Sequence, residues 1–312
     1  MIELSIIVVT WNAMRYVQEC LASLIAQTLE APMEIIVVDN ASTDGTQEMV
    51  RRVFPNIVLI ENTTNLGFAR ANNMGIRCAA GKYIALINSD VTVPPECLNT
   101  LHAYMEQNPS AGIVGPAMLR PDGTVGRSYM RFPTVWNCLS NALCLNILFP
   151  GSRAFGGWMM ADFTGGTCEV DVLNGWFLLV RREAFEQTGP LDERFFMYGE
   201  DIDWSYRFKN TGWKRIYCSE ARALHYGGAS SAAAPARFYI EMQKADFQYW
   251  KKHHNGVVVL GYWLTMLIHQ LIRLGGYAIA YFLKPGIQGE ALFKMRRSAA
   301  SIAWMVAGRV DS

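Results

Sequence analysis

The sequence predicts an α/β fold in which a mostly parallel sheet lies between helices, with an amphipathic helical extension at the C-terminal end. Short apolar runs alternate with stretches of helical periodicity from residue 3 to about 225. Apolar residues in these runs are nearly continuous instead of alternating with polar ones, which indicates strands buried on both faces. Apolar residues make up 51% of the 312-residue chain, so a disordered or low-complexity chain is excluded.

In the first half of the chain, each apolar run is followed by a helical period. The run at 4–9 precedes apolar side chains at three-and-four spacing, and the run at 35–38 completes a β-α-β unit. Polar residues at 42–44 predict the cap of the next helix, and Pro94 and Pro95 open another. The remaining elements expected here are strands at 57–60, 83–87 and 113–118 and a helix at 68–78.

The periodicity fails between residues 127 and 168, although this segment is rich in tryptophan, phenylalanine and leucine. A long apolar segment without a clear period is more often a substrate-side loop or lid than a second core. Regularity returns with a helix at 201–210, which Thr211 and Gly212 close. Strands are expected around this helix at 176–180, 214–218 and 221–225.

The stretch at 257–283 is the most apolar part of the chain, but His269, Gln270 and Arg273 interrupt it, so a simple transmembrane helix is doubtful. Four polar residues recur at every fourth position and share one helical face: Thr265, His269, Arg273 and Tyr277. A second, basic amphipathic helix follows residues 285–286. We expect residues 257–308 to bind an anionic membrane surface. A helical dimer interface or a lid on the core is the alternative.

Charge divides the chain unevenly. Residues 1–249 carry 20 basic and 25 acidic side chains, whereas residues 250–312 carry 8 and 2, so the two parts are expected to meet different partners. Seven cysteines without a Cys-x-x-Cys pair argue against a disulfide framework and a structural zinc site. The first residues lack the positive charge of a signal peptide. We therefore expect a cytoplasmic protein, and no nucleic-acid partner.

Clusters of polar residues follow several of the expected strands, where an open α/β sheet places its ligand. Asp39 ends the second strand, and its carboxylate can accept the N3–H of uracil or thymine, a hydrogen that cytosine lacks. The alternative is that Asp39 and Ser42 only cap the next helix.

A second cluster consists of Asn88, Ser89 and Asp90, directly after a buried strand. Asp90 is placed to hold a divalent metal ion against a diphosphate, because hard cations take oxygen ligands. His225, at the end of the last strand, can supply a further ligand through its imidazole. The alternatives are a turn formed by 88–90 and a structural histidine.

Three carboxylates crowd the start of the helix at 201–210: Glu200, Asp201 and Asp203. Preceding aromatic residues exclude water and the helix dipole stabilises anions, so a carboxylate here can act as a general base. Asp201 and Asp203 also form an Asp-x-Asp pair that rivals Asp90 for the metal. Because residues two apart face different sides of a helix, we assign Asp201 to chemistry and Asp203, four residues before Arg207, to structure.

Five motifs, in this order, resemble those of the inverting family 2 glycosyltransferases, whose GT-A fold is Rossmann-like. They are SIIVVTWN at 5–12, VDNASTDGT at 38–46, NLGFARANN at 65–73, NSD at 88–90 and LDERFFMYGEDIDW at 191–204. The resemblance covers residues 3 to about 230. The third and fifth motifs look like those of the rhamnosyltransferase branch, which is similar to galactofuranosyltransferases.

The resemblance implies that Thr10 and Asp39 contact the nucleoside, and that Asp90 and His225 hold Mg²⁺ or Mn²⁺ on the donor diphosphate. Asp201 is the implied general base. Further donor-site positions are implied at Asn65, Gly67, Arg70, Asn88 and Ser89. Asn88 stands where the family has the first aspartate of Asp-x-Asp, so one metal-binding carboxylate is missing.

The implied reaction is an inverting sugar transfer in cell-envelope glycan synthesis, for which we expect L-rhamnose from dTDP-rhamnose and a lipid-linked saccharide or polysaccharide acceptor. Galactofuranosyl or other hexosyl transfer from a UDP-sugar is the alternative. Residues 1–250 are expected to form the catalytic domain, with a nucleotide-sugar half to about 120 and an acceptor half from about 121. Residues 251–312 are expected to form a tail that associates with the inner face of the cell membrane or forms a homo-oligomer.

Functions of two other classes can be weighed from the residues. A sugar-nucleotide nucleotidyltransferase needs a glycine-rich basic triphosphate loop near its N-terminus, but residues 5–16 contain no glycine and only one basic residue, Arg15. A non-catalytic glycan-binding scaffold is expected to lack the base, yet Glu200 and Asp201 are both present.

Overall fold

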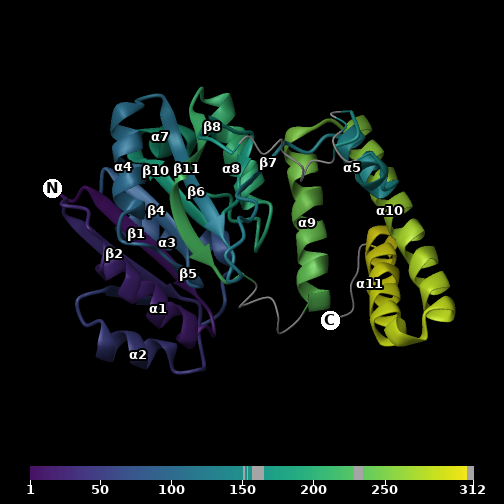
Figure 1. Ribbon diagram of the computed structural model, residues 1–312, viewed down its shortest axis with the longest axis horizontal. Helices are drawn as coiled ribbons and strands as arrows, with labels where there is room; N and C mark the ends of the chain where they lie inside the picture. Colours follow the sequence, from purple (N-terminus) through teal and green to yellow (C-terminus); the bar gives the residue numbers. More distant parts are fainter. Residues whose placement is uncertain (150–151, 153, 157–164, 228–234, 308–312) are drawn as a thin grey trace. The chain divides into compact units, whose positions relative to one another are not determined.

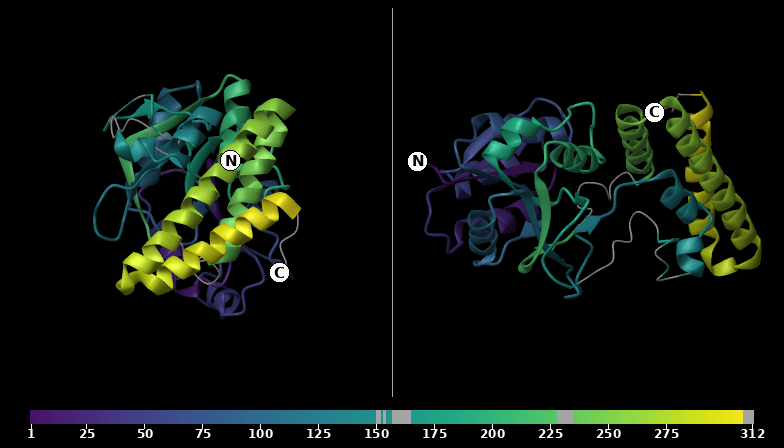
Figure 2. Two further views of the ribbon diagram at one scale, coloured as in Figure 1. Left: turned by 90° about the vertical axis from the view of Figure 1, so that its right-hand side faces the viewer. Right: turned by 90° about the horizontal axis from the view of Figure 1, so that it is seen from above.

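The computed structural model describes residues 1–149, 152, 154–156, 165–227 and 235–307 (Figures 1 and 2). The chain divides into two compact units. Unit 1 comprises Met1–Arg131 and Asp162–Pro235, and unit 2 comprises Phe132–Ala161 and Ala236–Ser312.

Unit 1 is built on a nine-stranded sheet with the order β3-β2-β1-β4-β10-β6-β11-β5, in which β8 also pairs with β11. Its strands are β1 (Leu4–Thr10), β2 (Met33–Asp39), β3 (Val58–Glu61), β4 (Tyr83–Asn88), β5 (Val91–Thr92), β6 (Ala111–Leu119), β8 (Cys168–Glu169), β10 (Phe177–Arg181) and β11 (Lys214–His225). The neighbours β3, β2, β1 and β4 pair in parallel, as do β6 and β11. The antiparallel pairs involve β10, β5 and β8. The predicted mostly parallel sheet is confirmed. Two short strands, β7 (Tyr129–Met130) and β9 (Val172–Leu173), form a separate antiparallel pair.

Helices pack on both faces of this sheet. They are α1 (Met14–Ile25), α2 (Thr46–Val53), α3 (Phe68–Cys78), α4 (Cys97–Gln107), α7 (Arg182–Thr188) and α8 (Glu200–Asn210). Ile6 and Val8 of β1 belong to the same buried cluster as the apolar face of α1. Alternate strand residues point to the opposite face. There α3 approaches Ile7 so closely that a Cβ on Gly75 would lie 2.6 Å from the Ile7 side chain. The predicted burial of the strands on both faces is therefore confirmed.

The last strand differs from the expectation of two strands at 214–218 and 221–225. The structure has one strand, β11, whose pairing with β6 shifts register between Cys218 and Arg222. The extra residues form a bulge, which keeps one strand continuous across a break in the apolar pattern. The helix α7 and the short strands β5 and β8 were not expected from the sequence.

Unit 2 is helical. It contains α5 (Val135–Ala142), α6 (Leu145–Leu148), α9 (Pro235–His253), α10 (Gly256–Leu283), a 3₁₀ turn (Pro285–Ile287) and α11 (Gln288–Ala307). The aromatic rings of Phe247 and Trp250 on α9 lie 5.0 and 4.7 Å from the ring of Tyr262 on α10. These contacts pack α9 against α10, and the second segment of unit 2 begins at Ala236, at the start of α9.

The segment at 127–168, expected as a loop or lid, contains the two helices α5 and α6. The helix α5 begins at Thr134, whose side chain accepts a hydrogen bond from Asn137, while the Asn137 side chain accepts one from Thr134 in return. It packs on α10. This capping box is short and polar, and the aromatic residues around it have no regular spacing, so apolar periodicity alone could not reveal the helix.

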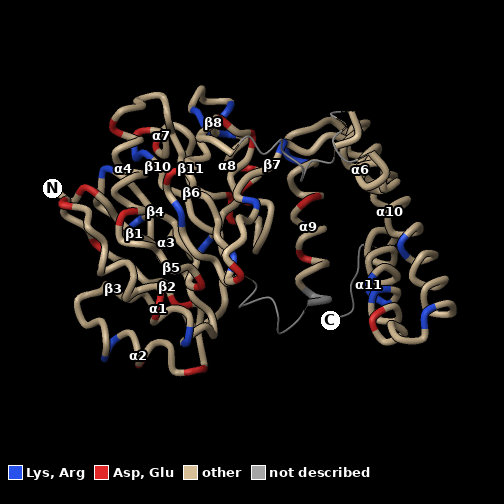
Figure 3. Tube along the Cα trace, viewed as in Figure 1, with Lys and Arg blue, Asp and Glu red and all other residues tan. Residues whose placement is uncertain are grey.

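The helix α10 has its polar residues turned inward and its apolar residues turned outward. Thr265 is buried, and buried Gln270 donates a hydrogen bond to the Tyr239 hydroxyl of α9 (2.8 Å). The exposed apolar side chains run along the helix: Val257, Leu260, Leu264, Ile268, Leu271, Ile272, Ile279, Phe282 and Leu283. The helix α10 carries one basic residue, Arg273, and α11 carries three, Lys294, Arg296 and Arg297 (Figure 3). In the described part of the chain, α10 is the one helix that is long and apolar enough to cross a membrane by length and composition (28 residues, mean hydropathy 1.6).

Candidate active site

The carboxyl ends of three neighbouring strands bring several of the predicted residues to one edge of the unit 1 sheet. Thr10 ends β1 and pairs in register with Asp39, which ends β2. Asn88 ends β4 on the other side of β1, opposite Val9. An open parallel sheet binds its ligand at this edge.

Of the two oxygens of the buried Asp39 carboxylate, one accepts hydrogen bonds and the other accepts none from the described residues. Its Oδ1 accepts hydrogen bonds from the Ser42 backbone N–H (2.9 Å) and the Gln47 side chain (2.6 Å). Its Oδ2 and the Thr10 hydroxyl are buried without a hydrogen-bond partner among the described residues. A buried acceptor without a partner is costly. Asp39 therefore holds the turn that precedes α2, as the capping alternative requires, and still offers an oxygen to a ligand N–H.

Asp90 and His225 lie side by side, although they come from distant parts of the chain. The strand β5, which follows Asp90, pairs with the end of β11 so that Val91 is opposite His225. The Nε2 atom of His225 lies 3.2 Å from Asp90 Oδ1. Asp90 is also fixed through its carbonyl, which accepts the Tyr226 N–H (3.0 Å). A carboxylate oxygen and an imidazole nitrogen this close together fit one divalent ion.

Asp201 lies in the first turn of α8, and two backbone groups orient its carboxylate. Gly175 N–H donates to Oδ2 (3.1 Å) and Ile202 N–H donates to Oδ1 (2.9 Å). Burial raises the pKa of Asp201, and these two N–H groups oppose the rise. Burial, together with the charge of Asp201, raises the pKa of Glu200 to about 8. The two N–H groups favour the charged form of Asp201, and a raised pKa makes a carboxylate a stronger proton acceptor.

One segment that the sequence analysis missed connects Asp201 with the Asp90–His225 pair. Gly175 holds Asp201, and the next residue, Trp176, stacks its ring on the His225 imidazole (centroids 5.3 Å apart, planes 13° apart). The Trp176 carbonyl also accepts the Asn88 N–H (2.9 Å). In the sequence, only a glycine and a tryptophan directly before a strand mark this segment. Its contacts with Asp201, Asn88 and His225 are made by backbone atoms and by the face of the Trp176 ring, which a sequence pattern does not reveal.

Asp203 has the structural role that its spacing predicted. It is fully buried and its Oδ2 lies 2.9 Å from Arg207 Nε. Arg207 also donates to the carbonyls of Thr188 and Pro190 (2.9 and 2.8 Å). Asp203 therefore ties α8, through Arg207, to the loop before it.

Two of the predicted donor-site residues of the third motif, Gly67 and Arg70, lie against the loop before α8. The Asn65 side chain accepts the Gly67 N–H (2.9 Å), and Asn40, next to Asp39, donates to the Gly67 carbonyl (3.1 Å). Arg70 is exposed, with its Nε 3.8 Å from Glu193. Ser89 is buried beside Asp90.

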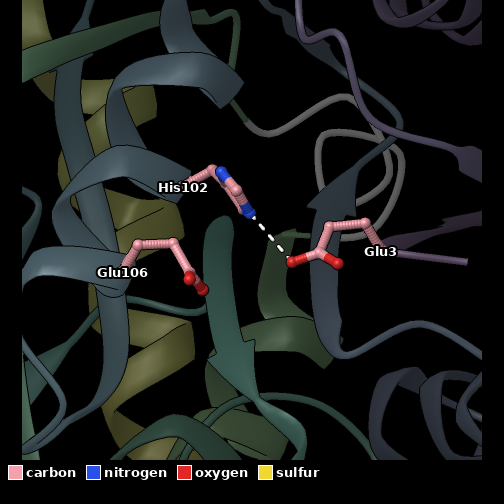
Figure 4. A group of neighbouring side chains, drawn as sticks. All are labelled: Glu3, His102 and Glu106. Carbon is pink, nitrogen blue, oxygen red and sulfur yellow. Dashed lines mark hydrogen bonds and ion pairs between the residues drawn. The ribbon is translucent and has the colours of Figure 1, made fainter.

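Among the described residues, one other group could share a metal ion: Glu3, His102 and Glu106 (Figure 4). His102 Nε2 lies 3.1 Å from Glu3 Oε1. However, Lys82 Nζ lies 2.6 Å from Glu106 and 3.5 Å from Glu3, so it already supplies positive charge. The group lies at the amino ends of β1 and β4, away from Asp39 and Asp90. We interpret it as an ion-pair cluster that ties α4 to the sheet.

Comparisons with known proteins give consistent matches. The family model described as glycosyl transferase family 2 matches residues 5–189. An N-acetylglucosaminyl-diphospho-decaprenol L-rhamnosyltransferase of Mycobacterium tuberculosis (strain H37Rv) is 31% identical over 81% of this chain and 85% of its own. Glycosyltransferase GlyG of Streptococcus pneumoniae serotype 4 is 32% identical over 87% of this chain and 86% of its own.

Two solved structures share the fold. The mannosyltransferase PcManGT of Pyrobaculum calidifontis, in complex with GDP-Man and Mn²⁺, superposes with a TM-score of 0.55 at 18% identity, over 98% of this chain and 76% of its own. TarS of S. aureus superposes with a TM-score of 0.53 at 18% identity, over 86% of this chain and 42% of its own.

Proposed function

The chain belongs to glycosyltransferase family 2, and we propose that it transfers L-rhamnose from dTDP-rhamnose to a lipid-linked saccharide with inversion at the anomeric carbon. The strongest support for the sugar and acceptor is the 31% identity, over most of both chains, to a rhamnosyltransferase named for a lipid diphosphate acceptor. The alternative is galactofuranosyl or other hexosyl transfer from a UDP-sugar. Family membership removes the support for a nucleotidyltransferase or a non-catalytic scaffold.

The observation that carries the mechanism is the segment 175–176, which contacts Asp201 on one side and the Asp90–His225 pair on the other. A base and a diphosphate site that share one rigid segment can act on the two sides of one sugar. In this proposal Thr10 and Asp39 bind the nucleoside. The same donor-binding role is proposed for the remaining motif positions: Asn65, Gly67, Arg70, Asn88 and Ser89.

In this proposal Asp39 selects the nucleobase of the donor. Its Oδ2 can accept the N3–H of thymine or uracil, whereas cytosine N3 has no hydrogen to donate. The Oδ1 atom is already held by Ser42 and Gln47, so the carboxylate is oriented before the nucleotide binds. Such preorganisation lowers the entropy cost of binding.

In the transfer step, Asp201 accepts the proton of an acceptor hydroxyl while that oxygen forms a bond with the anomeric carbon. The bond between the anomeric carbon and the diphosphate oxygen breaks, and its electron pair leaves with the nucleoside diphosphate. Attack from the face opposite the leaving group inverts the configuration. A Mg²⁺ or Mn²⁺ ion held by Asp90 and His225 would neutralise the charge that grows on the diphosphate.

The test is acceptor-dependent release of nucleoside diphosphate. The full chain, incubated with dTDP-rhamnose and a lipid-diphosphate N-acetylglucosamine acceptor, is expected to release dTDP, whereas donor alone is expected to release little. The product is expected to have inverted configuration at the new linkage by NMR. Turnover with UDP-galactofuranose or another UDP-hexose, but not with dTDP-rhamnose, would favour the alternative donor. Release that does not depend on any acceptor would contradict the transferase mechanism.

We also propose that unit 2 holds the protein on the inner face of the cell membrane. The supporting observation is the polarity of α10, whose polar residues pack inside the unit while its apolar stripe is exposed. Lys284 and Arg296 are exposed and add positive charge to the same unit. Each basic residue near an anionic leaflet contributes about 1 kcal/mol, and buried apolar area adds to it.

Flotation with vesicles tests the membrane proposal. The full chain is expected to float with phosphatidylglycerol-containing vesicles, and salt should weaken but not abolish binding, because salt screens charges and leaves apolar insertion intact. The double variant Leu264→Glu/Ile268→Glu places two charges in the exposed stripe and should lose binding. Met242→Glu is the matched control, because Met242 is exposed on α9 outside this stripe. A full chain that stays in solution with every vesicle type and forms a dimer that the double variant dissociates would make the stripe an oligomer interface.

A further inference from the structure

The loop between α7 and α8 leads directly to Asp201, and a buried residue of α3 holds it. Asn73 forms two hydrogen bonds with the backbone of Leu191, 118 residues away in sequence. Leu191 N–H donates to Asn73 Oδ1 (3.1 Å), and Asn73 Nδ2 donates to the Leu191 carbonyl (2.8 Å). The amide thus binds Leu191 as a neighbouring strand would, through one donor and one acceptor.

The first turn of α3 holds the same loop at a second point. Phe68 N–H donates to the Phe196 carbonyl (2.7 Å). Gly67 lies so close to this carbonyl that a Cβ would be 2.3 Å from its oxygen. The positive φ of Gly67 (+82°) also disfavours any other residue. The helix α3 therefore fixes the loop at Leu191 and again at Phe196.

The helix α8 holds the opposite side of the loop. Trp204 Nε1 donates to the Gly189 carbonyl (2.9 Å), and Arg207 donates to the Pro190 carbonyl (2.8 Å). Between these contacts and Asp201 the chain passes through two residues with positive φ, Tyr198 (+68°) and Gly199 (+77°). A tyrosine in this conformation is costly and persists only where its surroundings impose it.

We propose that Asn73 is a positioning residue for the general base. By fixing Leu191 it holds the segment 191–199 in the conformation from which α8 begins, and so sets the direction of the Asp201 carboxylate. The inference rests on the proposed function, which makes Asp201 the base. It also gives the third motif a role beyond donor binding, since Asn40, next to Asp39, bonds to the Gly67 carbonyl at the start of the same helix.

The adjacent residue, Asn72, provides a matched control. It is as buried as Asn73, but among the described residues its amide donates only to the Phe68 carbonyl within α3 (3.0 Å). Replacing either asparagine with alanine removes one buried amide from the same helix. If Asn73 has a merely structural role, the two variants should lose similar amounts of activity. If it positions the base, Asn73→Ala should lower kcat more than Asn72→Ala.

The experiment compares Asn73→Ala with Asn72→Ala in the full chain. A displacement of about 1 Å at a reacting group can cost about a hundredfold in rate, so we expect Asn73→Ala to lower kcat by about 10-fold to 100-fold. Donor KM should change by less than about threefold, because Thr10 and Asp39 are untouched. Asn72→Ala should change both by less than about threefold. Hydrogen exchange in residues 189–199 should be faster in Asn73→Ala than in Asn72→Ala.

The outcomes separate this inference from the proposed function. If Asn73→Ala does not fold, Asn73→Asp replaces it. Its carboxylate still accepts the Leu191 N–H, but it loses the bonds that Asn73 Nδ2 donates to the Leu191 carbonyl and to Glu193 (3.1 Å) and faces that carboxylate with a like charge. Equal kcat and equal exchange in the Asn72 and Asn73 variants of an active enzyme would overturn the inference alone. A wild type that releases no nucleoside diphosphate from any sugar donor in the presence of acceptor would overturn the proposed function and the assignment of the base with it.

Discussion

Replacing Asp201 with asparagine tests the general base directly. The asparagine carbonyl can accept one of the two backbone hydrogen bonds, from Gly175 or Ile202, that Asp201 accepts now. The other N–H would lose its acceptor, at a cost of about 1–3 kcal/mol. Removal of a charge whose burial raises the pKa of Asp201 offsets part of that cost. We therefore expect a folded variant whose Tm is close to that of the wild type.

The effect on catalysis should be much larger, because an amide cannot accept the acceptor's proton. Loss of a general base typically costs about a hundredfold to ten-thousandfold in rate, or about 3–5.5 kcal/mol in the barrier. The assay is release of nucleoside diphosphate with acceptor present, and calorimetry with the nucleoside diphosphate should give an affinity within about twofold of wild type.

Glu200→Gln is the comparison for Asp201→Asn. The pKa of Glu200 is raised to about 8, so this side chain is mostly neutral at pH 7, and a neutral isostere should keep most of the activity. Retention of more than a tenth of wild-type turnover by Asp201→Asn would refute the assignment. If Glu200→Gln were the inactive variant, the base would be Glu200.

Three further predictions concern the nucleoside, the metal ion and pH. Asp39→Asn should weaken binding of dTDP and UDP about 10-fold or more, because a hydrogen bond to a charged group contributes about 1.5–3 kcal/mol. A competition assay in which the variant loses no affinity for dTDP and UDP relative to its affinity for CDP would contradict the role of Asp39. Asp90→Ala and His225→Ala should each remove the metal-dependent part of nucleoside diphosphate binding, and equal calorimetric affinity of the wild type with Mn²⁺ and with chelator would show that no metal takes part. Because burial raises the pKa of Glu200 from 4.5 to about 8, its ionisation destabilises the fold as pH rises through that range. Glu200→Gln should therefore raise Tm at pH 8.5 and leave it unchanged at pH 4, and equal shifts at both would refute this.

The sheet could be predicted because each parallel strand carries its own signal. Continuous apolar runs such as Leu4–Thr10 report burial on two faces without any knowledge of the neighbouring strands. The strand β11 was predicted as two pieces, because a bulge depends on the register of its partner β6. The short strand β5 consists of two residues whose pairing with β11 is entirely non-local. Local pattern therefore predicts the elements, and pairing details come only from the fold.

The positions of several candidate side chains could be predicted from the sequence, whereas the contacts that hold them could not. Asp39 and Asp90 stand directly after apolar strands, so their position at one edge of the sheet follows from the sequence. The contacts that orient Asp201 are made by backbone N–H groups, one of them from Gly175, and every residue type except proline has such a group. The Trp176 ring that stacks on His225 reads in sequence as another core aromatic. Asn73 was recognised as part of a motif, yet its partner Leu191 lies 118 residues away.

The helix α10 shows why periodicity alone cannot assign a face to water. The spacing of Thr265, His269, Arg273 and Tyr277 correctly places them on one side, but the same spacing fits a polar side in water or a polar side inside a bundle. The structure decides this through partners: Gln270 bonds to Tyr239, Lys294 lies 5.2 Å from the Tyr277 ring, and Arg297 lies over Tyr239 at 4.1 Å. With these groups satisfied inside unit 2, the apolar stripe is left outside. A stripe of this length exposed to water is costly, and this cost is the physical reason to expect a lipid surface against it.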